Sequence, residues 1–201
     1  HMQAGEVLHH AAAIGGILDA GCFPTGTDAV ISAVCTALTV AGFSADADPR
    51  PLRWKYAKLL QNLGNALQAV CAVTEDGSAV LRLLRDEALA CYAAAGIDAA
   101  SREDVSARHG TLMRHGRIEG AARGGGSSWQ SLVRGTGDIE ADFLNGEICL
   151  LGRLHGIPTP ANEVLRHHAG CAARERWAPG RYTVAEVISA IEALKAHATS
   201  H

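Results

Sequence analysis

Residues 52–72 read LRWKYAKLLQNLGNALQAVCA and hold the most informative feature of the sequence. It contains no proline, and its apolar residues recur at the three- and four-residue spacing of an amphipathic helix. The spacing predicts one long helix. Three polar residues, Lys58, Asn62 and Asn65, stand at positions i, i+4 and i+7 of that helix. At 100° per residue they would fall within about 40° of one another on one face.

This polar stripe has two interpretations. An amine and two carboxamides among so many leucines are costly to bury without hydrogen-bond partners. Either the stripe is an ordinary solvated face, or it faces a ligand. In the second interpretation Lys58 is a proton donor or oxyanion partner, and Asn62 and Asn65 orient a substrate through hydrogen bonds.

The chain after residue 51 reads as helical almost throughout. Further helices are expected over residues 78–95, 98–109, 137–155 and 160–177, with a last helix that Thr183 and Glu186 open as a capping box. Gly96 and Gly156 end two of these helices. The glycine-rich residues 116–126 cannot form a helix interior.

The chain before residue 51 has a different character. Short extended pieces are expected at residues 7–10, 14–19 and 43–45, with a helix capped by Thr27 or Asp28 between the last two. Two prolines mark residues 46–51 as a linker. The sequence therefore predicts a mainly α protein with a small β element before the linker.

Composition excludes several classes of function. The chain has 201 residues, 48% hydrophobic and 19% charged, so a core can form and disorder is excluded as the main state. A net charge of −3 argues against nucleic acid or an anionic membrane as the partner. We expect no signal peptide, because the first residues lack a basic segment followed by a long apolar one. No apolar run reaches the roughly 18 residues that a membrane span needs.

The cysteines and histidines do not form a recognisable metal or redox motif. The six cysteines are scattered without a C-x-x-C pair, and four of them sit in apolar runs, so we expect small core residues in a reducing cytoplasm, with disulfides as the alternative. No H-E-x-x-H or comparable ligand spacing occurs, so no metal site is expected.

A second group of candidate residues follows the glycine-rich loop. Ser127 and Ser128 come directly after it, where a hydroxyl can contact the carboxylate or hydroxyl of a substrate. Glu140 is expected at the start of a helix, and its ordinary explanation there is a favourable charge–dipole interaction.

Four motifs in the same order resemble the C-terminal part of the ketopantoate reductase family. They are KLLQNLGNAL (residues 58–67), Ser127-Ser128, IEADFLNGE (residues 139–147) and HGIPTPAN (residues 155–162). The resemblance implies a helical domain like the C-terminal domain of 6-phosphogluconate dehydrogenase. It also implies an oxidoreductase of pantothenate biosynthesis that reduces a small-molecule 2-oxo acid, 2-oxopantoate, with NADP as cofactor, and a homodimer is expected.

The same resemblance implies a role for individual residues. Lys58 matches the lysine that protonates the developing alkoxide, and Asn62 matches the first substrate-orienting asparagine. Ser128 matches a substrate-contacting serine, and Glu140 matches the glutamate beside the cofactor. The family's second asparagine usually falls at the position of Ala66, so Asn65 can replace it only if the helix register or the substrate differs.

The chain departs from the family most at its beginning. The opening G-x-G-x-x-G and the first strand–helix units are absent. The resemblance implies that residues 1–47 are a remnant of the Rossmann domain and that residues 48–201 are the substrate-binding, dimerising domain. We expect this chain alone to be inactive. The alternative is a non-catalytic helical ligand-binding or dimerisation module on the same scaffold.

Overall fold

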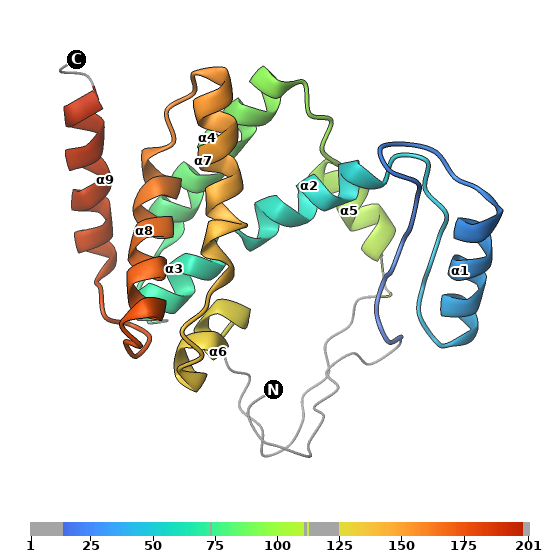
Figure 1. Ribbon diagram of the computed structural model, residues 1–201, viewed down its shortest axis with the longest axis horizontal. Helices are drawn as coiled ribbons and strands as arrows, with labels where there is room; N and C mark the ends of the chain where they lie inside the picture. The colour runs from blue at the N-terminus through green and yellow to red at the C-terminus, as the bar shows by residue number, and fades with distance from the viewer. Residues whose placement is uncertain (1–13, 73, 111, 113–124, 199–201) are drawn as a thin grey trace. The chain divides into compact units, whose positions relative to one another are not determined.

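The computed structural model describes residues 14–72, 74–110, 112 and 125–198, which are mainly helical (Figure 1). Its elements are α1 (Ala29–Val40), α2 (Pro51–Asn62), α3 (Asn65–Val70), α4 (Ser78–Ala95), α5 (Arg102–His109), α6 (Ser127–Arg134), the 3-10 helix η1 (Glu140–Asp142), α7 (Asn145–His155), α8 (Pro160–Arg174) and α9 (Val184–Ala198). The mainly α fold class is confirmed. The sequence predictions for residues 7–10 and 116–124 lie outside the described residues.

The described residues divide into two compact units. The first contains residues 14–58, 97–110 and 112, and the second contains residues 59–72, 74–96 and 125–198. Helix α2 passes from the first unit into the second between Lys58 and Leu59.

The first unit contains a small parallel β element. Ile17 pairs with Ser44 and Ala20 pairs with Ala47, both in parallel bridges. The backbone hydrogen bond from Leu18 N to Ser44 O is 2.9 Å long. Helix α1 connects the two extended segments, and the Asp28 side chain caps it by accepting a hydrogen bond from Ile31 N at 2.7 Å. Two parallel strands joined through a helix form the connection that parallel sheets require.

An ion pair ties α5 to the β element within the first unit. Arg108 Nε donates to Asp19 Oδ2 at 2.8 Å, and the two side chains are only 15% and 11% exposed. Asp19 Oδ1 also accepts a hydrogen bond from the backbone N–H of Asp46 at 2.9 Å, next to the second strand. The carboxylate of Asp19 therefore connects α5 to both extended segments.

Helix α8 lies at the centre of the second unit. It packs against α3, α4, α6, α7, α9 and η1. Leu84 of α4, Ile148 of α7 and Leu165 of α8 are fully buried. Burying side chains of this size contributes about 1.5–3 kcal/mol each. Among the described residues, no helix is both long and apolar enough to cross a membrane.

The prediction of one helix over residues 52–72 is wrong. The helix stops at Asn62 and a new one begins at Asn65. At the break, the carbonyl oxygen of Leu63 accepts a hydrogen bond of 3.2 Å from the side-chain amide of Asn145. A Cβ on Gly64 would lie 2.7 Å from Leu81 Cδ2, so α4 approaches the chain closely at this point. A side chain that binds a helix carbonyl is a known cause of such interruptions.

The prediction of one helix over residues 137–155 is also wrong. The carbonyl oxygen of Glu140 accepts hydrogen bonds from Phe143 N and Leu144 N, both at 2.9 Å, which closes the short turn η1. Asn145 then begins α7 with its side chain in the core. Glu140 therefore opens a 3-10 turn rather than an α-helix.

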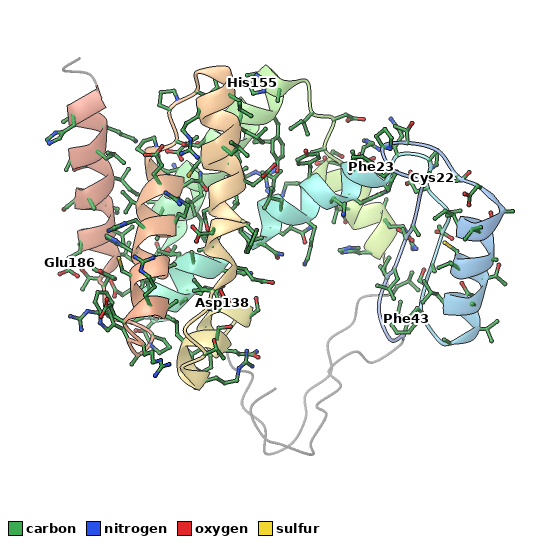
Figure 2. The ribbon with its side chains drawn as sticks, in the orientation of Figure 1. Cys22, Phe23, Phe43, Asp138, His155 and Glu186 are labelled. Carbon is green, nitrogen blue, oxygen red and sulfur yellow. The ribbon has the colours of Figure 1, made fainter. Side chains whose placement is uncertain are left out.

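Local signals located several of the other helix ends, although α5 begins at Arg102 rather than at residue 98. Thr183 and Glu186 form the expected capping box before α9, with Thr183 N donating to Glu186 Oε2 at 2.8 Å. Figure 2 labels Glu186 near the start of α9. Gly96 and Gly156 end α4 and α7 in the left-handed conformation, with φ of 66° and 68°. Helix α8 ends at Arg174, before residue 177, because Arg176 takes a φ of 53° that no helix can continue.

Candidate functional site

The polar residues predicted on one stripe lie on two different helices. Lys58 is exposed and precedes Asn62 by one turn of α2. Asn62 is the last residue of α2 and Asn65 is the first of α3, and both are half-buried. The angle of about 40° expected for a continuous helix no longer describes Asn65, because the break at Leu63 and Gly64 changes the register.

Within the second unit, α6 begins against the polar edge of α3. Gly126 is the N-cap of α6 and supplies no side-chain capping bond. A Cβ on Gly126 would lie 3.2 Å from Gln68 Oε1 and 3.4 Å from Asn65 Oδ1. Two carboxamides of α3 therefore stand close to the helix end at which free N–H groups and the positive end of the helix dipole are found.

Ser128 is the most unusual polar residue at this junction. Its side chain is only 2% exposed, and its hydroxyl finds no hydrogen-bond partner among the described residues. By contrast, the hydroxyl of Ser101 caps α5 by accepting from Asp104 N at 3.0 Å. A buried hydroxyl without a partner costs about 1–3 kcal/mol. Such a group is explained if it serves a bound molecule.

The structure brings two of the predicted site residues onto neighbouring helices. Asn65 and Ser128 lie on α3 and α6, which pack against each other, and Gln68 joins them there although the sequence did not single it out. Glu140 lies on η1 and is exposed. The hydroxyl of Ser128 has no hydrogen-bond partner among the described residues, so Glu140 does not bind it.

A buried carboxamide pair lies in the interior of the second unit. Asn145 and Asn162 have no exposed surface, and Asn145 Nδ2 donates to Asn162 Oδ1 at 3.0 Å. Asn162 Nδ2 in turn donates to Glu87 Oε2 at 2.8 Å and to the carbonyl oxygen of Leu84 at 3.3 Å. Both asparagines occur in the quoted motifs IEADFLNGE and HGIPTPAN. Their position on otherwise apolar helix faces was the available signal.

Glu87 anchors this pair and also caps α8. Its Oε1 accepts from Ala161 N at 2.8 Å and its Oε2 accepts from Asn162 N at 3.0 Å. These are free N–H groups of the first turn of α8, where a negative charge is favourable. Burial nevertheless raises the pKa of Glu87 above its ordinary value, with the hydrogen bonds from Ala161 and Asn162 opposing that change.

The histidines and cysteines form no metal centre in the described parts of the chain: no group of three or more His, Cys, Asp and Glu side chains could hold an ion there. His168 is instead packed against Tyr182, with ring centroids 4.2 Å apart. Burial lowers the pKa of His168, and the neighbouring His167 lowers it further. All six cysteines are free.

Comparison with known proteins identifies a protein family that contains these residues. The family model described as "Ketopantoate reductase PanE/ApbA C terminal" matches residues 51–170, which is more than half of the chain. That match contains Lys58, Asn62, Asn65, Ser128, Glu140 and both buried asparagines. No curated protein matches the sequence significantly.

Two solved structures are similar to the chain. A PanE/ApbA family ketopantoate reductase from Ralstonia eutropha JMP134 is 26% identical, with a TM-score of 0.61, over 80% of this chain and 52% of that one. A 2-dehydropantoate 2-reductase from Methylococcus capsulatus is 17% identical, with a TM-score of 0.61, over 80% and 55% of the two chains. The chain thus spans about half the length of these relatives. By its sequence match over residues 51–170, the chain belongs to the ketopantoate reductase family through that family's C-terminal domain.

Proposed function

We propose that this chain is the substrate-binding portion of an NADP-dependent reductase that converts a 2-oxo acid of the ketopantoate type to its 2-hydroxy acid in pantothenate biosynthesis. Family membership supports the reaction class. The observation that carries the proposal is the buried hydroxyl of Ser128, which has no partner in the described residues and lies at the start of α6 beside α3. A polar substrate with several oxygens would satisfy it.

Each candidate residue has a role suited to its chemistry. The ammonium group of Lys58 donates a proton to the alkoxide oxygen as the carbonyl is reduced. Asn62, Asn65 and Ser128 bind and orient the oxo acid through hydrogen bonds. The NADP cofactor, when bound, supplies the hydride. Glu140 is exposed on η1, so its carboxylate can accept hydrogen bonds from the hydroxyls of the cofactor ribose.

We further propose that residues 1–47 belong to the cofactor-binding domain and residues 48–201 to the substrate-binding domain. The parallel bridges of Ile17 and Ala20, with α1 between the two extended segments, support the first assignment. The second is supported by the match over residues 51–170. Because the chain spans about half the length of its solved relatives, we expect it to bind a 2-oxo acid without reducing it.

We propose a homodimer in the cytoplasm as the working state. Two exposed leucines one turn apart on α7, Leu150 and Leu154, support a partner surface on the helical unit. The free state of all six cysteines supports a reducing compartment.

The proposal is tested by titrating the chain with ketopantoate and following backbone amide signals by NMR. We expect saturable shifts at Gly126, Ser127 and Ser128. Ser128→Ala should weaken binding at least tenfold, corresponding to about 1.4 kcal/mol. Ser127→Ala is the matched control, because the neighbouring side chain is exposed, and it should bind as the unmodified chain does.

Titration with NADPH completes the test. We expect no saturable binding of NADPH and no oxidation of it when ketopantoate is added. Oxidation dependent on the oxo acid would contradict the expected inactivity of the chain alone. Absence of ketopantoate binding would contradict the substrate-binding role and favour a non-catalytic module.

A further inference from the structure

The break between α2 and α3 controls where two proposed substrate-binding residues point. Asn62 ends α2 and Asn65 begins α3, with only Leu63 and Gly64 between them. In an uninterrupted α-helix, the carbonyl oxygen of residue 63 would accept a hydrogen bond from the N–H of residue 67. The carbonyl oxygen of Leu63 instead accepts from Asn145 Nδ2 at 3.2 Å. The direction of Asn65 therefore depends on a side chain outside both helices.

Asn145 is well suited to hold this carbonyl. Its side-chain amide has two N–H groups: one binds Leu63 O and the other binds Asn162 Oδ1 at 3.0 Å. The side chain has no exposed surface and Leu63 is 2% exposed, so water does not readily replace the bond. Its Oδ1 finds no partner among the described residues, so the burial of this carboxamide rests on its two donated bonds.

The orientation of Asn145 is set by a chain of hydrogen bonds that ends at Glu87. Glu87 accepts from Asn162 Nδ2 at 2.8 Å, which directs Asn162 Oδ1 away from the carboxylate and toward Asn145. Because Asn162 Oδ1 is an acceptor, Asn145 must turn its amide nitrogen toward it. Only this orientation also gives Leu63 O a donor. The carboxylate on α4 thereby determines the hydrogen bond at the break of α2 and α3.

We infer that Asn145 is a positioning residue that keeps α2 and α3 apart and so presents Asn62 and Asn65 to the substrate. The inference rests on the proposed function for the identity of that substrate. The geometry of the break does not depend on the proposed function. The arrangement also explains how Asn65 can serve although the family's second asparagine usually lies one position later: the break changes the register on which that comparison depends.

The geometric part is tested with Asn145→Leu in the full chain. This substitution keeps the approximate size and removes both N–H donors. We expect the ¹³Cα shifts of Leu63 and Gly64 to move toward helical values, because Leu63 O becomes available to Leu67 N. Asn145→Ser serves as a second variant if the leucine variant does not fold. Unchanged shifts at Leu63 and Gly64 in a folded variant would overturn the inference.

A matched control separates positioning from general loss of stability. Val187→Ala removes fully buried volume from α9, and conditions are chosen so that both variants are equally far below their melting temperatures. We expect Asn145→Leu to weaken ketopantoate binding at least tenfold and Val187→Ala to leave it within twofold. Equal weakening by both variants would overturn the positioning role.

The two proposals fail in different ways. If the unmodified chain does not bind ketopantoate, the proposed function is contradicted, and the ¹³Cα shifts still decide whether Asn145 maintains the break. If the unmodified chain binds and Asn145→Leu binds equally well with altered shifts, the positioning role is contradicted and the proposed function stands.

Discussion

The side-chain amide of Asn145 donates a 3.0 Å hydrogen bond to Asn162 in the interior of the helical unit, where neither side chain has any exposed surface. Two carboxamides in such a place are tolerated only because their donors are used. The pair joins α7 to α8, and its further bonds reach α4 and Leu63, the residue that follows α2. A substitution at any residue of this hydrogen-bond network should therefore affect the packing of several helices.

Glu87→Gln is the first such substitution. Both oxygens of Glu87 accept hydrogen bonds from N–H groups of Ala161 and Asn162. A glutamine at this position would turn its NH2 group toward one of these N–H donors in either orientation of the amide. We expect the free energy of unfolding to fall by about 1–3 kcal/mol. Urea denaturation followed by circular dichroism measures the change. Glu163→Gln, in the first turn of α8 that Glu87 caps, is the control, and an equal loss in both variants would contradict the prediction.

The stability of the chain should depend on pH through His168. Its pKa in the folded state lies below the ordinary value of 6.5, mainly because of burial. As pH falls below 6.5, the unfolded chain takes up a proton that the folded chain does not, so the free energy of unfolding decreases until pH reaches the lower folded value. We therefore expect the free energy of unfolding to decrease between pH 7 and pH 5 because of this group.

Replacement of the ring identifies the group responsible for this pH dependence. His168→Phe keeps a ring against Tyr182 and should reduce the loss of stability between pH 7 and pH 5. His167→Gln removes a neighbouring exposed histidine and should retain most of the loss. Thermal melts between pH 7 and pH 5 measure how the melting temperature of each variant changes with pH. The same change in His168→Phe as in the unmodified chain would contradict the assignment to His168.

Ser128→Ala and Ser101→Ala should have opposite effects on stability. Removing the buried, unpartnered hydroxyl of Ser128 should leave the free energy of unfolding unchanged or raise it by up to about 1 kcal/mol. Removing the capping hydroxyl of Ser101 should lower it by about 1 kcal/mol. Differential scanning calorimetry measures both. A clear destabilisation by Ser128→Ala would show that the hydroxyl has a structural role instead.

The ion pair of the first unit gives the last prediction. Arg108→Met leaves the carboxylate of Asp19 largely buried without its partner, and we expect a loss of about 3 kcal/mol in the stability of that unit. Hydrogen exchange at the amides of Leu18, Ala20 and Ser44, which donate the hydrogen bonds between the two extended segments, reports it locally. Adding Asp19→Asn should recover part of the loss, because the unpaired charge is then removed. Complete additivity of the two substitutions would contradict the coupling.

Much of the helical architecture could be predicted because its signals are local. The capping box of Thr183 and Glu186 joins residues three positions apart, and Gly96 and Gly156 end helices through their own backbone conformation. Each signal is complete within one helical turn, so no tertiary information is needed to read it.

The site could be predicted only in part because its geometry depends on distant residues. Hydrophobic periodicity continues through Leu63 and Gly64, and the side chain that binds the carbonyl oxygen at the break, Asn145, lies 82 residues later in the sequence. The type of residue at position 128 suggested a substrate contact, but its burial depends on the packing of α6 against α3. Gln68 escaped notice because nothing near it in the sequence indicates that Gly126 will approach it.

The cap of α8 has a consequence for folding. Thr159 occupies the N-cap position without providing a side-chain bond, and the acceptor comes from Glu87 on another helix, 74 and 75 positions away from the two N–H groups that it binds. A peptide containing only α8 would lack that acceptor and should be weakly helical in water. The start of this central helix is therefore completed only when α4 docks, which couples the formation of the two helices and makes assembly of the unit more nearly all-or-none.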